Sequence, residues 1–253
     1  MPNLVIDPKM TTPSGFSKRD GTVAFYAQVA NLVNEQTVLL DLGAGRASWY
    51  EDDASRFDVS HPRFLKDKVG KVIAVDVDPV VLQNRTAHEC YVMRDNRIPL
   101  EDKTIDVIVA DFVLEHIEKP EEFFLEVNRV LRSGGWFCAR TPHKYNYVSM
   151  IAQLVKNDRH ASVLMLVQPD RKEIDVFPTV YSMNTKSKLK KLFSSYTDHT
   201  YIYKSEPGYT FGSRFVYFLL SAAHSLMPPA LCGQLFVFMN KPRELQSPNR
   251  LAD

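Results

Sequence analysis

Residues 38–45, which read Val-Leu-Leu-Asp-Leu-Gly-Ala-Gly, join an apolar run to two glycines separated by one residue. The run is short and shows no alternation of polar and apolar residues, which is typical of a strand buried on both faces of a parallel sheet. Glycines directly after such a strand permit a tight turn whose backbone can approach a ligand closely. This stretch predicts a strand, a turn and a ligand site, although a purely structural turn is the alternative for the glycines.

The same pattern continues through the first 140 residues, where short apolar runs alternate with segments of helical spacing. Strands are predicted at 37–42, 71–75, 105–110 and 135–140, and helices at 24–33 and 120–131. Strands that alternate with helices imply crossover connections and a parallel sheet covered on both faces. We therefore expect an α/β protein with a Rossmann-like, doubly wound sheet.

After Pro142 the pattern changes to predominantly helical segments. The predicted helices lie at 147–156, 161–167, 186–193 and 213–227, and further strands at 199–204 and 234–239. We expect a mostly parallel sheet of seven strands, with an antiparallel last strand and a helical insertion before the last two strands.

Composition excludes several classes of protein. The 253 residues include 31 Lys+Arg and 30 Asp+Glu, a formal net charge of +1, so no nucleic-acid partner is expected. Apolar residues at 45% and charged residues at 24% are those of a folded globular chain. Cys90, Cys138 and Cys232 are far apart, which predicts no metal site and favours a reducing compartment. Residues 1–20 lack the apolar core of a signal peptide, so we expect a cytoplasmic protein.

Asp41 indicates which kind of ligand the glycine turn receives. A carboxylate just before the glycines would repel a pyrophosphate seated on the turn, but it suits a ligand with an ammonium group and a cationic centre. Ser48 also stands where a dinucleotide-binding loop usually has a third glycine. Both features disfavour a nicotinamide-dependent reductase.

Asp76 ends the predicted strand Lys-Val-Ile-Ala-Val-Asp at 71–76. In nucleotide-binding α/β folds, an acid at this place accepts hydrogen bonds from ribose hydroxyls. A loop acid without a ligand is the alternative. The acid and the glycine turn together favour a nucleoside ligand.

These motifs, taken as a set, resemble a class I S-adenosylmethionine-dependent methyltransferase of the small-molecule, type 11-like branch. The matching segments are 41–45, Asp76, 97–102, 105–116 and 128–135, within about residues 37–145. The resemblance implies a single methyltransferase domain over 1–253, with a cofactor-binding core at 37–145. Residues 146–233 would be a helical insertion or cap with substrate-side elements. The resemblance also implies S-adenosyl-L-methionine as the cofactor.

The resemblance further implies a set of cofactor-binding residues. They are Asp41, Gly43, Ala44, Gly45, Asp76, Val77, Asp95, Asn96, Asp111 and Phe112. The first four would contact the amino-acid part, the next two the ribose, and Asp95 with Asn96 the adenine edge. If the register follows Pro99, Arg94 matches the adenine position instead. The last two should lie at the carboxyl end of the fourth strand.

No catalytic residue follows from the motifs. The electrophile of a sulfonium is already activated, so placing donor and acceptor in line can supply most of the acceleration. A general base would help a hydroxyl or ammonium acceptor. His116 and His143, after the fourth and fifth strands, are the candidates, and a structural histidine is the alternative for each.

The expected function is methyl transfer to a small-molecule, lipid-linked or glycan-linked acceptor. The alternative is a non-catalytic S-adenosylmethionine-binding module that acts as a sensor or complex partner. Residues 213–227 are apolar nearly all round, which predicts either burial against the sheet or peripheral membrane contact. The lysines at 186, 188, 190 and 191 are interpreted as a solvated helix face, with an anionic substrate or surface as the alternative.

Overall fold

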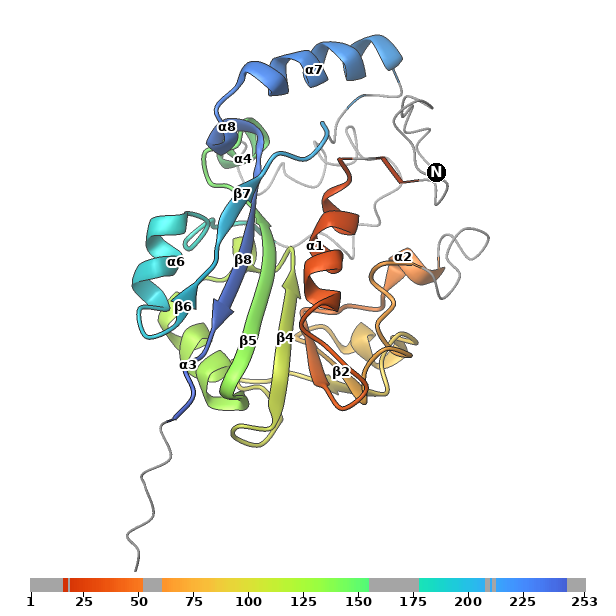
Figure 1. The fold of residues 1–253 in the computed structure, drawn as a ribbon, viewed down its shortest axis with the longest axis vertical. Coiled ribbons are helices and arrows are strands. Elements are labelled where there is room, and N and C mark those ends of the chain that lie inside the picture. The colour runs from red at the N-terminus through yellow and green to blue at the C-terminus, as the bar shows by residue number, and fades with distance from the viewer. Residues whose placement is uncertain are drawn as a thin grey trace, which may run out of the picture.

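A central sheet organises the molecule (Figure 1). The computed structural model describes residues 16–17, 19–51, 61–154, 178–207, 210 and 213–244. The sheet has eight strands in the order β3-β2-β1-β4-β5-β8-β6, with β7 also paired to β8. The parallel strands are β1 (Val38–Leu42), β2 (Lys71–Asp76), β3 (Glu89–Val92), β4 (Ile105–Asp111) and β5 (Leu131–Pro142). β8 (Gln234–Asn240) is antiparallel to β5, and the doubly wound α/β class predicted from the sequence is confirmed.

The sheet has eight strands where seven were expected, because two short strands occur around the one predicted at 199–204. β7 (Tyr201–Tyr203) lies within the predicted range, β6 (Thr197–Asp198) precedes it, and both pair with β8. Between them the Asp198 carboxylate accepts a hydrogen bond from the Thr200 N–H at 2.7 Å. This local side-chain bond competes with the sheet ladder and interrupts the strand.

Helices cover both faces of the sheet. α1 (Gly21–Ala30) and the 3₁₀ helix η2 (Pro79–Gln83) lie on one face, and α3 (Pro120–Val130) and α6 (Lys186–Leu192) lie on the other. Because side chains alternate along a strand, Leu39 packs toward α1 while Leu40 packs toward α3. Both leucines are buried, which explains the absence of polar alternation in β1.

The strand order places a topological switch point between β1 and β4, and we call the region outside the carboxyl ends of these two strands the crevice. The chain passes from β1 to β2 and β3 on one side and then returns to β4 on the other. Ligands of open α/β sheets bind at such a switch point, outside the carboxyl ends of the strands. Asp41, the penultimate residue of β1, is paired with Val109, and β4 ends at Asp111, so the two strands bring two aspartates close to this crevice.

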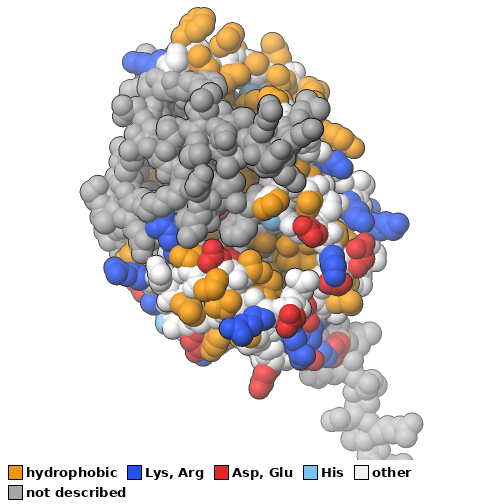
Figure 2. All heavy atoms as spheres, turned by 180° about the vertical axis from the view of Figure 1, so that it is seen from behind, with side chains coloured by type: hydrophobic (Ala, Val, Ile, Leu, Met, Phe, Trp, Pro, Cys, Tyr) orange, Lys and Arg blue, Asp and Glu red, His pale blue; other side chains and the backbone are white. Residues whose placement is uncertain are grey.

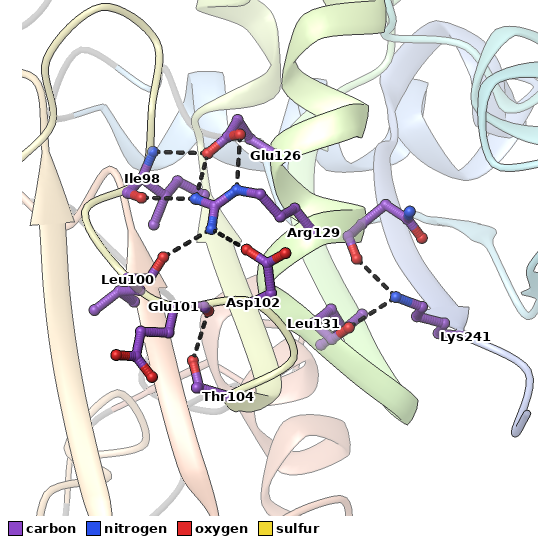
Figure 3. Close-up of polar contacts among 10 residues, drawn as sticks. Ile98, Leu100, Glu101, Asp102, Thr104, Glu126, Arg129, Leu131 and Lys241 are labelled. Atoms are coloured by element: carbon purple, nitrogen blue, oxygen red, sulfur yellow. Dashed lines mark hydrogen bonds and ion pairs between the residues drawn. The ribbon is translucent and has the colours of Figure 1, made fainter.

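An ionic network fixes the segment before β4 to α3 (Figure 3). The Arg129 guanidinium donates to Glu126 and Asp102, and also to the backbone oxygens of Ile98 and Leu100. Lys241 donates to the backbone oxygen of Leu131 at 2.8 Å, just after α3 ends. This network holds the loop at 97–104 against the helix.

The segment between β5 and β8 contains α4 (Tyr147–Leu154), α6, α7 (Arg214–Leu226) and α8 (Pro229–Cys232), together with β6 and β7. The predicted helix at 161–167 lies outside the described residues. Figure 1 shows α7 at the end of the molecule where the parallel strands have their carboxyl ends. No helix among the described ranges has the length and apolar character required to cross a membrane.

Candidate functional site

The glycine turn after β1 adopts backbone angles that favour glycine. Gly43 has φ +74° and Gly45 has φ +51°, both in the left-handed region. The Gly43 N–H donates to the Val75 carbonyl at 2.7 Å, and a Cβ at Gly43 would lie 2.4 Å from a methyl of Val113. A Cβ at Gly45 would meet nothing within 4 Å. The first glycine is thus required by packing against the loop after β4, while the second borders open space.

Asp76 is oriented by two backbone groups. Its Oδ2 accepts a hydrogen bond from the Gly45 N–H at 2.8 Å, and its Oδ1 accepts one from the Asp78 N–H at 2.9 Å. Each carboxylate oxygen can accept more than one hydrogen bond, so both oxygens retain capacity for a ligand. The neighbouring Val77 side chain is 53% exposed. The structure therefore brings the end of β2 and the glycine turn together.

Asp41 is a half-buried carboxylate that receives no hydrogen bond from the described part of the chain. Burial, together with the charges of Asp111 and Asp76, raises the pKa of Asp41 to about 7 against the opposing effect of Arg63. A carboxylate held this way in a crevice is a candidate binding group, because a cationic ligand would relieve the cost of its charge.

Asp111, at the end of β4, forms a bidentate ion pair with Arg140 of β5. The two residues are register partners, and both guanidinium–carboxylate distances are 2.7 Å. Burial would raise the pKa of Asp111, but the guanidiniums of Arg140 and Arg63 outweigh it and hold the pKa below its usual range. Asp111 is therefore ionised and already paired, in contrast to Asp41.

Three more side chains complete this cluster. Arg63 lies 3.3 Å from Asp111 Oδ2, and the Tyr26 hydroxyl donates to the same oxygen at 3.3 Å. Arg140 also donates to Thr22 Oγ1 at 2.9 Å, which fixes α1 to the sheet edge. None of the sequence motifs predicts a role for Arg140, Arg63 or Tyr26. Of these three residues, only Arg140 could have been found from the sequence. It lies near the end of an apolar strand, and a buried arginine requires a partner of opposite charge such as Asp111 on the adjacent strand.

Phe112 follows Asp111 in a left-handed conformation, with φ +58°. Its N–H donates to the Arg140 carbonyl at 2.8 Å, and its ring lies 4.7 Å from the Arg140 guanidinium carbon. A bulky residue in this conformation is strained and persists where its surroundings hold it in place. The structure thus places Phe112 beside the charge cluster.

Asp95 and Asn96 occupy the two central positions of a tight hairpin turn. Their φ values are +51° and +55°, and the Arg97 N–H donates to the Arg94 carbonyl at 2.8 Å. These are the angles of a type I′ turn, which favours Asn and Asp. Both side chains are exposed, and the Asn96 amide donates to Glu122 of α3 at 3.3 Å. Their contact with adenine stays a prediction.

The two candidate histidines are held differently. His116 ends the 3₁₀ helix η3 (Leu114–His116), and its Nδ1 lies 2.7 Å from the Pro178 carbonyl oxygen. A carbonyl only accepts, so Nδ1 carries the proton and Nε2 carries the lone pair in the neutral ring. This tautomer is the one that leaves Nε2 as the basic atom.

His143 has both ring nitrogens engaged by the backbone. Its Nδ1 accepts from the Tyr145 N–H at 3.3 Å, and the ring has a hydrogen bond with the backbone of Ala230. Burial lowers the pKa of His143 despite this second bond. These contacts favour a structural role for His143, in which it joins the end of β5 to α8.

A buried polar chain that the sequence motifs do not predict links the loop after β4 to the end of β5. The Thr141 hydroxyl donates to Glu115 at 2.7 Å and accepts from the Asn184 amide at 2.5 Å. The Glu115 carbonyl also accepts from the N–H groups of Val180 and Tyr181. The segment from 178 to 184 thereby holds the two loops that border the crevice.

Comparison with known proteins identifies the core of the chain. Residues 40–139 match the family model described as a methyltransferase domain. A probable S-adenosylmethionine-dependent methyltransferase of Mycolicibacterium smegmatis is 33% identical over 89 residues, which is 33% of this chain and 34% of that protein. A probable S-adenosylmethionine-dependent methyltransferase of Mycobacterium tuberculosis is 33% identical over 81 residues, 30% of each chain. The chain thus spans about a third of the length of the curated relatives it matches.

Solved structures share the fold over most of the chain. A chain of the complex between the Haloferax volcanii Trm112 methyltransferase activator and the putative methyltransferase has a TM-score of 0.55 and 15% identity, and the match covers 90% of this chain and 92% of that one. The geranyl diphosphate C-methyltransferase of Streptomyces coelicolor, solved with S-adenosyl-L-homocysteine, has a TM-score of 0.52 and 11% identity, with coverage of 87% and 74%. At these identities the likeness establishes the fold.

Proposed function

Residues 40–139 form a class I S-adenosylmethionine-dependent methyltransferase domain, and from this premise we propose that the chain methylates a small-molecule, lipid-linked or glycan-linked acceptor. The observation that carries the proposal is the half-buried Asp41 beside the glycine turn. Among the described residues, Asp111 is paired with Arg140 and Asp76 accepts two backbone N–H bonds, whereas Asp41 has neither kind of partner.

The residues of the crevice fit the cofactor. The sulfonium nucleoside supplies an activated methyl group, and Asp41 would accept hydrogen bonds from its ammonium group. Gly45 provides space for the amino-acid part, since no atom lies within 4 Å of where its Cβ would be. Asp76, oriented by two backbone N–H groups, would accept from the ribose hydroxyls.

The remaining residues would shape the place where the acceptor meets the methyl group. Asp111 and Phe112 stand at the end of β4, next to the glycine turn across the switch point. Their rigid attachment to Arg140 favours a fixed wall against which donor and acceptor align. Alignment of this kind supplies much of the acceleration of an in-line displacement.

The function is tested by calorimetry and by a labelled-methyl assay. The folded protein should bind S-adenosylmethionine and S-adenosyl-L-homocysteine saturably. It should also transfer label to one fraction of an extract separated into lipids, small molecules and macromolecules. Absence of binding would refute the proposal, while binding without a methylated product would favour the sensor or complex-partner alternative.

His116 is proposed as the base when the acceptor is a hydroxyl or an ammonium. His116→Gln should lower kcat by about 100-fold, because general-base catalysis contributes at least this much. It should also remove the acidic limb from the pH profile of kcat, measured at saturating cofactor. The Pro178 carbonyl, which orients the ring, can still receive a hydrogen bond from glutamine.

His143→Gln is the matched control for this experiment. It removes a histidine engaged by Tyr145 and Ala230, so it should lower the thermal midpoint while keeping the acidic limb of kcat. If the acidic limb of kcat is lost in the His143 variant and kept in the His116 variant, His143 is the base and His116 has the structural role.

A further inference from the structure

α7 carries an exposed apolar face on one side of the helix. Phe215, Phe218, Leu219 and Leu226 are 76%, 48%, 59% and 90% exposed. Their spacing of three, four and eleven residues from Phe215 places them on a single face, which we call the α7 patch. Figure 2 shows hydrophobic side chains gathered at this end of the molecule.

The opposite face of α7 is fixed to the protein. Tyr217 and His224 are 2% and 5% exposed. His224 Nε2 lies 3.3 Å from the Tyr147 hydroxyl of α4, and Lys204 donates to the His224 carbonyl at 3.0 Å. Since this face is seated, the helix cannot rotate to bury the α7 patch.

The surroundings of the α7 patch carry positive charge. Residues 213–232, which include α7 and α8, contain Arg214 but no Asp or Glu. Residues 143–154, which include α4, contain Lys144 and likewise no carboxylate. On α4, Met150 and Ile151 are 44% and 57% exposed, so this helix adds apolar surface at the same end of the molecule (Figure 1).

The charge and the apolar surface together indicate which kind of partner binds the α7 patch. A second copy of the chain would bring an identical cationic surface, and the like charges of Arg214 and Lys144 would oppose pairing. A bilayer with anionic headgroups instead offers opposite charge around an apolar interior. At 13 residues, α7 is shorter than the roughly 20 needed to span a bilayer, so it would lie in the interface.

We propose that the α7 patch docks this protein on the surface of an anionic phospholipid bilayer. Because α7 lies at the carboxyl end of the parallel strands, docking would turn the crevice toward the lipid. The inference deepens the proposed function, since it places the acceptor at a membrane. Docking itself requires neither cofactor nor methyl transfer.

The test is co-sedimentation of the full chain with vesicles. Vesicles of phosphatidylglycerol and phosphatidylcholine should pellet the protein, those of phosphatidylcholine alone should bind at least tenfold less, and high salt should weaken binding. The variant F215S/L226S should reduce binding at least tenfold. The control L82S/L125S changes two leucines that are 61% and 62% exposed on η2 and α3, and it should bind as the wild type does.

Three outcomes would overturn the proposal. They are no binding to either vesicle, equal loss in both double variants, and a dimer in light scattering that F215S/L226S converts to a monomer. Circular dichroism of each variant establishes that it is folded. Since vesicles are used without cofactor, docking and methyl transfer succeed or fail independently.

Discussion

Asp41→Asn should weaken S-adenosylmethionine binding roughly 10- to 100-fold, the range expected for loss of a hydrogen bond to a charged group. The same variant should raise the thermal midpoint of the unliganded protein. The ionised carboxylate is costly there, as its pKa of about 7 indicates, and asparagine removes that charge with little change in shape. A binding group that lowers the stability of the empty protein is a known compromise between stability and function.

The pH dependence of this effect has a definite sign. A folded-state pKa raised from 3.8 to about 7 contributes stability that is complete below pH 4 and is lost as the pH rises to 7. The stability gain of Asp41→Asn should therefore be largest above pH 7 and shrink toward pH 4. Cofactor affinity of the wild type should fall as the pH drops below 7, because the ammonium must then displace a proton from Asp41.

Thermal melts and calorimetry from pH 5 to 8 measure both effects. Glu101→Gln is the matched control, since it removes a similar charge from an exposed side chain, and it should alter neither affinity nor its pH profile. Equal cofactor affinity in the Asp41→Asn variant and the wild type would remove Asp41 from the site.

Arg140→Met should lower the free energy of unfolding by about 3–5 kcal/mol, the range for breaking a buried ion pair by removal of one partner. Arg140 is 2% exposed, and its loss leaves Arg63 as the cationic partner of the Asp111 carboxylate among the described residues. It also removes the bond to Thr22 that holds α1 at the sheet edge.

Urea unfolding of single and double variants separates the causes. Asp111→Asn combined with Arg140→Met removes both charges, so the double variant should be more stable than Arg140→Met alone. If the free energy of unfolding of Arg140→Met lies within about 1 kcal/mol of the wild-type value, the Asp111–Arg140 ion pair does not stabilise the fold as expected.

The sequence predicts the parallel core well because local patterns determine it. Apolar runs, turn glycines and terminal acids report burial and backbone geometry at their own positions, so the sequence predicts β1, β2 and β4 and places Asp41, Asp76 and Asp111 near their carboxyl ends. The class of fold followed from the alternation of strands and helices.

Features that depend on contacts between distant segments were missed. Asp111 contacts Arg63, Tyr26 and Arg140, which come from three separate segments of the chain. The sequence around each of these residues gives no indication of the contact. The break between β6 and β7 similarly depends on one side-chain bond of Asp198. His116 and His143 could be distinguished only by what their ring nitrogens contact.

The contact between Gly43 and Val113 constrains how this chain can diversify. The glycine turn and the loop after β4 touch there with no room for one additional carbon, because a Cβ at position 43 would lie 2.4 Å from a methyl of Val113. A change of acceptor preference through the loop after β4 must therefore keep position 113 no bulkier than valine. Variation is less restricted at Val180, whose side chain is 40% exposed and which is tied to the Glu115 carbonyl through its backbone N–H.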